Sequence, residues 1–144
     1  LENIAEAFGY PRGSLLSQIN ALFELPTDSI AIMSERLIQK EESWKIWLFN
    51  FVDLFRKTKD EALILNPPSQ KTSPKMKALL ASTVETLCDE LEIAPPWWCT
   101  AILPLTNPWF VSGIENLKAL SLVESPLHFR KRKIFVLKNF LERF

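Results

Sequence analysis

Residues 43–58, "SWKIWLFNFVDLFRKT", carry the pattern from which the fold class is first inferred. Its large apolar residues recur at i, i+3, i+4, i+7, i+10 and i+11, the intervals that place side chains on one stripe of an α-helix. They are Trp44, Trp47, Leu48, Phe51, Leu54 and Phe55. No polar residue interrupts this stripe. We therefore predict a central core helix whose two tryptophans pack in the core rather than forming an aromatic cage.

Helical periodicity continues on both sides of this segment. Before it, residues 14–25 form a short amphipathic pattern that ends at Pro26, and residues 27–29, "TDS", offer N-cap oxygens for a second helix. After it, Ser73 and Pro74 are typical of the N-cap and first residue of a long helix over residues 75–92. A last pattern runs through residues 113–125. The apolar faces comprise Leu15, Ile19, Leu22 and Phe23; Ile30, Met33, Leu37 and Ile38; Met76, Leu79, Leu80, Val84, Leu87, Cys88 and Leu91; and Ile114, Leu117, Leu120 and Leu122.

The chain has only three glycines, which leaves few positions for hairpins or glycine-rich phosphate loops, whereas its ten prolines fall mostly between the periodic segments. We therefore predict an all-α protein, a single compact domain of residues 1–144 with about six to seven helices. Residues 66–74, "NPPSQKTSP", are the clearest loop and a candidate joint between subdomains. Residues 93–110, "IAPPWWCTAILPLTNPWF", form an irregular segment rich in Pro and Trp.

At 144 residues the chain is about the size of one domain. No apolar stretch approaches the roughly 18 to 20 residues of a membrane span, and residues 1–9 do not resemble a secretory signal. Cys88 and Cys99 have no CxxC neighbour, so we expect both to be reduced and buried. These features predict a cytoplasmic protein without contact to a membrane.

No catalytic motif is visible in the sequence. The single histidine, His128, has no nucleophile motif near it, and neither a phosphate-binding loop nor a metal-ligand spacing occurs. We therefore expect no enzymatic activity, no cofactor and no bound metal.

Positive charge is concentrated at one end of the chain. Residues 126–144 carry six basic residues and one acidic residue, a net charge of +5, and four of the basic residues are consecutive at 130–133. Because the whole chain is neutral, the remainder carries −5. Three interpretations stay open for this run: an internal contact with acidic residues of the 75–92 helix (Glu85, Asp89, Glu90, Glu92), a protein partner, or the phosphates of a nucleic acid.

Three motifs resemble a known family: "KALLASTVETLCDELEIAPPWW" at 77–98, "NPWF" at 107–110, and "LKALSLVESPLHFRKRKIFVLKNFLERF" at 117–144. The pattern is similar to a domain of bacterial regulators of the helix-turn-helix type, and the resemblance covers about residues 43–144. Members of this family resemble antitoxin-like proteins paired with nucleotidyltransferase-like partners. Its most specific element is the ESPxxFRxRxIFV motif, matched here by Ser125, Pro126, Phe129, Arg130, Arg132, Ile134 and Phe135.

The resemblance implies a non-enzymatic binding protein, antitoxin-like or regulatory, that acts on a protein partner, which would be a nucleotidyltransferase-like protein. Many family members carry a DNA-binding domain upstream, but here "AEAFGYPRGSLLSQI" at 5–19 has Pro11 where the turn into a recognition helix is expected. The alternative function is therefore a nucleic-acid-binding regulator that uses the basic segment. We predict a partner-binding surface whose side chains are at least partly accessible; it comprises Trp97, Trp98, Trp109, Arg130, Lys131, Arg132 and Lys133.

Overall fold

The computed structural model describes residues 29–142 of the chain. Six α-helices and one pair of two-residue strands make up the regular structure of this range, so the all-α prediction is confirmed. The helix predicted over 14–25 lies outside the described residues. In chain order the helices and strands are α3 (Ile30–Gln39), α4 (Trp44–Thr58), α5 (Pro74–Glu90), α6 (Trp98–Ala101), β1 (Trp109–Phe110), α7 (Lys118–Glu124), α8 (Leu127–Arg130) and β2 (Ile134–Phe135), with short 3-10 turns at Glu41–Ser43, Glu61–Leu63 and Glu115–Leu117.

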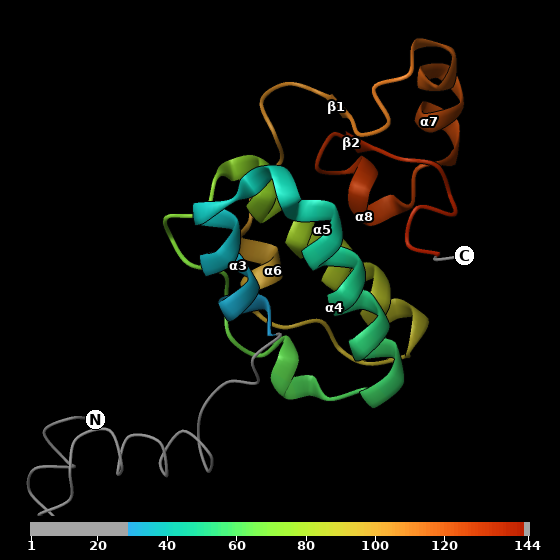
Figure 1. The fold of residues 1–144 in the computed structure, drawn as a ribbon. Helices are drawn as coiled ribbons and strands as arrows, with labels where there is room; N and C mark the ends of the chain where they lie inside the picture. The colour runs from blue at the N-terminus through green and yellow to red at the C-terminus, as the bar shows by residue number, and fades with distance from the viewer. Residues whose placement is uncertain (1–28, 143–144) are drawn as a thin grey trace, which may run out of the picture.

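The central element is α5, which is in contact with α3, α4, α6 and α8 (Figure 1). It begins as its sequence predicts: the Ser73 hydroxyl accepts a hydrogen bond from the Met76 N–H at 3.3 Å, and Pro74 occupies the first turn. A helix covered on all sides is buried around its whole circumference rather than along one stripe. Its buried residues are Met76, Ala78, Leu79, Leu80, Ala81, Ser82, Thr83, Val84, Glu85, Leu87 and Cys88.

The prediction that the 43–58 helix is the central one is wrong, because α4 buries one face only, through Leu48, Phe51, Val52 and Phe55. The Phe51 and Phe55 rings stack with centroids 5.8 Å apart, as their spacing predicts. Its two tryptophans are partly buried and pack against the edge of the core.

The loop over residues 66–74 connects helices that share one core, because α3, α4 and α5 pack against each other. The loop is attached to α3 by a hydrogen bond from the Ser69 N–H to the Ser34 hydroxyl at 2.8 Å.

Residues 109–142, here called the C-terminal lobe, sit above the helical body of residues 30–101 in Figure 1, and α7 lies at the outer edge of the lobe. The two strands of the lobe pair in parallel, with Trp109 opposite Ile134 and Phe110 opposite Phe135. Phe129, Ile134 and Val136 anchor the lobe in the common core. None of the helices in the described part of the chain is long and apolar enough to cross a membrane.

Candidate functional site

Part of the basic run forms a buried ionic cluster with α5. The Arg132 guanidinium is in ion-pair contact with the Glu85 carboxylate, and both side chains are buried, with 3% and 5% of their surface exposed. Arg132 also donates to the Cys99 carbonyl at 2.7 Å, and the Lys131 ammonium lies 2.8 Å from the second oxygen of Glu85. A buried carboxylate is tolerated only when cations and hydrogen bonds compensate its lost hydration. The cluster therefore belongs to the fold and joins the lobe to α5.

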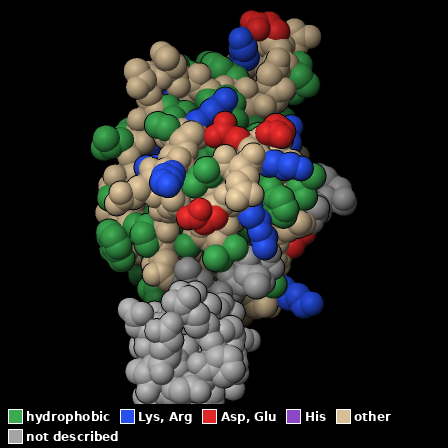
Figure 2. Space-filling view, turned by 60° about the vertical axis from the view of Figure 1, so that its left-hand side comes forward, with side chains coloured by type: hydrophobic (Ala, Val, Ile, Leu, Met, Phe, Trp, Pro, Cys, Tyr) green, Lys and Arg blue, Asp and Glu red, His purple; other side chains and the backbone are tan. Residues whose placement is uncertain are grey.

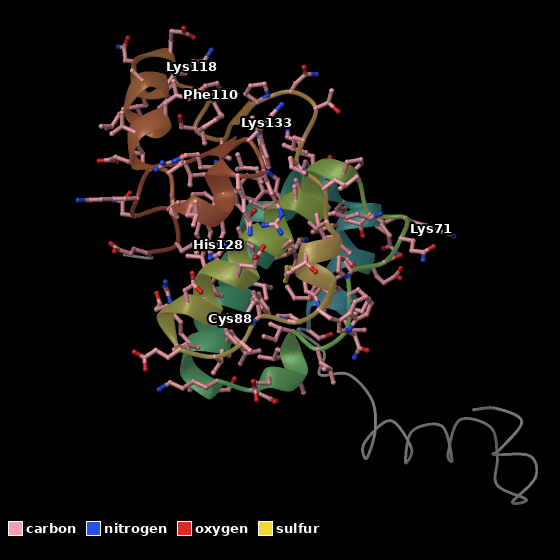
Figure 3. All side chains as sticks on the ribbon, turned by 180° about the vertical axis from the view of Figure 1, so that it is seen from behind. Lys71, Cys88, Phe110, Lys118, His128 and Lys133 are labelled. Atoms are coloured by element: carbon pink, nitrogen blue, oxygen red, sulfur yellow. The ribbon has the colours of Figure 1, made fainter. Side chains whose placement is uncertain are left out.

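His128 extends this cluster toward the surface, at the place in Figure 3 where the lobe meets α5. Its Nε2 atom lies 2.5 Å from an Asp89 carboxylate oxygen, and its Nδ1 atom lies 3.5 Å from Glu85. Its backbone carbonyl accepts a hydrogen bond from the buried Ser82 hydroxyl at 2.9 Å. These contacts hold the start of α8 against α5.

Of the acidic residues expected to meet the basic run, Glu85 does so, while Asp89 pairs with His128 just before the run. Glu90 instead pairs with Arg56 of α4 at 2.9 Å, and Glu92 is exposed beyond the end of α5. The expectation that Arg132 is accessible is wrong, because its guanidinium is enclosed between α5, α6 and α8. The helix that compensates its charge is the acidic 75–92 helix, one of the three partners considered for the run.

Arg130 and Lys133 are exposed, and so is Lys131, whose side chain is 42% exposed although it pairs with Glu85. Arg130 donates to the carbonyls of Ser125 at 2.8 Å and Val123 at 3.3 Å, at the C-terminal end of α7. These hydrogen bonds hold the guanidinium in one place, and neither of them is to a carboxylate. Lys133 adopts a left-handed backbone conformation with φ of 64° between α8 and β2. Of the four consecutive basic residues, Lys131 and Arg132 therefore pair with Glu85 within the molecule, whereas Arg130 and Lys133 face outward.

The three tryptophans of the predicted surface have different environments. Trp97 is 69% exposed, whereas Trp98 is fully buried and donates its indole N–H to the Ile64 carbonyl at 2.8 Å. The expectation that Trp98 is accessible is therefore wrong. Trp109 is partly buried between Trp44, whose ring lies 5.5 Å away, and the Lys75 ammonium, 4.2 Å from its ring centroid. These residues do not form one patch, because Trp98 faces the core and Trp109 faces the body.

The sequence analysis missed the main exposed apolar region of the described chain. The predicted apolar face of 113–125 does not pack: Ile114, Leu120 and Leu122 are exposed, and in α7 it is Ser121 that is buried. Val123, outside that face, is 76% exposed. On α8, Leu127 is 68% exposed. Ten large apolar side chains are exposed in the described range, and half of them lie between residues 114 and 127: Ile114, Leu120, Leu122, Val123 and Leu127.

This inversion has a local cause. The buried Ser121 hydroxyl donates to the Leu117 carbonyl of the preceding turn at 2.8 Å. Ser125, the C-cap of α7, accepts from the Val136 N–H at 2.8 Å, so a serine rather than a leucine attaches the end of α7 to the segment that follows β2. The sequence signal that could have revealed it is the pair of serines four residues apart between large apolar residues.

Figure 2 shows a face of the molecule on which Lys and Arg, Asp and Glu, and hydrophobic side chains are interspersed. At the top of the lobe in Figure 3, the Lys118 ammonium lies 5.4 Å from the Phe110 ring and pairs with Glu115 at 2.9 Å.

The two cysteines are free and buried, as predicted. Burial, together with the negative charge of Asp89, raises the pKa of the Cys88 thiol to about 11, and burial beside Glu85 raises the pKa of Cys99 to about 12. Thiols with such pKa values stay protonated at neutral pH and are poor nucleophiles. Within residues 29–142, no group of three or more His, Cys, Asp and Glu side chains is arranged to hold a metal ion.

Comparison of the chain with family models, with curated proteins and with solved structures finds no match.

Proposed function

We propose that the chain is a non-enzymatic cytoplasmic binding protein, antitoxin-like or regulatory, that acts by holding a protein partner. The proposed contact is the α7–α8 surface, defined as the exposed side chains of Val123, Leu127 and Arg130. The observation that carries the proposal is the concentration of exposed apolar side chains on residues 114–127, beside an arginine held in position.

Exposed apolar side chains gathered in one region are typical of interaction sites. Arg130 adds to this, because an arginine whose head is already fixed by hydrogen bonds loses little conformational entropy when a partner binds. Arginine is also enriched among the residues that contribute most to binding energy at protein interfaces. A partner with an acidic group bordered by apolar side chains would complement this surface.

The division of the basic run favours a protein partner over a nucleic acid. Nucleic-acid affinity rises with the number of cations that reach phosphates. Here Arg132 is buried and Lys131 is paired with Glu85, so two of the four consecutive cations are committed within the molecule.

The test is affinity capture from the native host with three matched variants. Leu127→Asp and Arg130→Ala alter the α7–α8 surface, whereas Leu103→Asp places the same charge on a side chain that is 78% exposed outside the lobe. We expect one partner to be retained by the wild type and by Leu103→Asp, and lost from the other two, with little change in melting temperature. Nuclease treatment and high salt should leave capture intact.

Equal capture by all four proteins would contradict the α7–α8 surface. Capture that disappears with nuclease, or binding to DNA or RNA that weakens steeply with salt, would favour the nucleic-acid alternative.

A further inference from the structure

A pocket of about 270 Å³ lies where the C-terminal lobe meets α4. One wall comes from α4, through Phe49 and Lys45, and the others come from the segments that follow β1 and β2, through Val111, Val136, Leu137 and Phe140. The pocket shares no residue with the α7–α8 surface. Pockets at the junction of two structural units are frequent sites for small ligands.

The lining is predominantly apolar and held in place by the core. The Phe49 and Phe140 rings lie 5.6 Å apart, and Phe140 also packs edge-on against the fully buried Phe129 ring at 5.8 Å. Val136 is only 3% exposed. An apolar cavity of about 150 Å³ can hold a benzene molecule, so this pocket has room for a tail of several carbons.

The polar part of the lining has one sign of charge. Lys45 is exposed at the pocket, and among the described residues that line it Lys45 is the only charged one and none is a carboxylate. The Ser112 hydroxyl accepts from the Ile114 N–H at 3.3 Å, which leaves its own proton for another acceptor. An apolar chamber beside one cation, one hydroxyl donor and the Asn139 side chain complements a ligand with an apolar tail and a single anionic head.

We propose that this pocket binds a small amphipathic carboxylate, with the tail among Phe49, Val136 and Phe140 and the carboxylate beside Lys45. The inference does not depend on the proposed protein partner. Because the walls come from both α4 and the lobe, a bound carboxylate would also strengthen the attachment of the lobe to the body, since a ligand stabilises the state that binds it.

The probe is octanoate, compared with octylamine and octanol, which carry the same tail with a positive or a neutral head. We expect calorimetry on the full chain to show saturable octanoate binding with a Kd on the order of 0.1 to 1 mM, the range for a ligand of this size. Octanol should bind several-fold more weakly and octylamine more weakly still. The backbone amide shifts in NMR spectra should concentrate on residues 111–112 and 136–140.

The decisive variant is Lys45→Glu, which reverses the one charge and lies in the first turn of α4, where an acidic residue suits the helix dipole. It should weaken octanoate binding roughly tenfold and make octylamine the preferred probe, because an attraction becomes a repulsion of similar size. Lys71→Glu, an exposed charge reversal in the 66–74 loop, is the matched control and should leave the order of the three probes unchanged.

Absence of saturable octanoate binding, including the case in which another segment of the chain already fills the pocket, would overturn the proposal. So would an unchanged preference for octanoate in Lys45→Glu, or amide shifts outside the two segments, since either places the ligand elsewhere.

Discussion

The helical body and the C-terminal lobe are stabilised in different ways. In the body, α5 is enclosed by α3, α4 and α6, and most of its buried residues are apolar, with the Arg56–Glu90 ion pair as an additional link to α4. In the lobe, four buried apolar residues (Phe129, Ile134, Val136 and Leu141) join the core, while much of the remaining attachment is polar: the Glu85–Arg132 cluster, the His128–Asp89 pair and the Ser125 contact at the end of α7.

This difference in attachment explains how the lobe can leave apolar side chains exposed. A region that is attached by polar contacts does not need to bury all its leucines and valines, so α7 can present them outward. Both regions expose large apolar side chains, but the body's four (Ile38, Ile46, Leu65 and Trp97) are spread along its sequence, whereas the lobe's five lie within residues 114–127. Variants in each region should therefore differ in how much stability they cost and in which part of the molecule loosens.

The largest effect is expected in the body. Phe51→Ala should lower the free energy of unfolding by about 3 to 5 kcal/mol, because it removes a fully buried ring that stacks on Phe55 and leaves a cavity. Urea denaturation followed by circular dichroism measures this. A cost below about 1 kcal/mol would mean that the α4–α5 core is loosely packed.

The next largest loss of stability is expected when the polar attachment of the lobe is broken. Arg132→Met should cost about 3 kcal/mol, the lower end of the range for breaking a buried pair, because Lys131 remains beside Glu85. The double variant Glu85→Leu with Arg132→Met should recover most of this loss, because no buried charge is left uncompensated. A single variant as stable as the wild type would show that the lobe does not rely on the ion pair.

A smaller loss is expected at the serine contact between α7 and β2. Ser125→Ala should cost about 1 to 3 kcal/mol, because the buried Val136 N–H loses its acceptor at 2.8 Å. Hydrogen exchange should accelerate in the lobe but not at the amides of α5. Equal acceleration in both regions would indicate that lobe and body open as one unit.

The smallest effect at neutral pH concerns the thiols. Because folding raises the pKa of Cys88 to about 11 and of Cys99 to about 12, folding favours their protonated forms. Their contribution to stability is full below the pKa of an unfolded thiol, about 8.5, and falls as the pH rises toward 11 to 12. Native protein at pH 8 should react slowly with a thiol reagent, and urea-unfolded protein quickly. Rapid reaction of native protein would show that the thiols are accessible.

Part of the candidate site was predictable from sequence. The exposed Arg130 and Trp97 were among the predicted surface residues, and the acidic helix over 75–92 was one of the partners considered for the basic run. The sequence did not show which of Arg130 and Arg132 is buried. The two residues carry the same charge, and they differ only in the residues that the folded chain brings next to them. The sequence also did not show which of Trp97 and Trp98 is buried, because only the folded structure shows in which direction each adjacent side chain points.

Periodicity and prolines in the sequence determined the class of fold, the positions of α3, α4 and α5, and the N-cap at Ser73, because these depend on residues a few positions apart. Only the tertiary structure decided which helix is central, which two of the four basic residues are committed to α5, and that α7 turns its serines inward and its apolar residues outward. These outcomes depend on contacts between residues about 30 to 50 positions apart, such as Cys99 or Ser82 with Arg132. A local pattern shows that a residue is apolar or charged, but whether that residue is buried depends on the elements that pack over it.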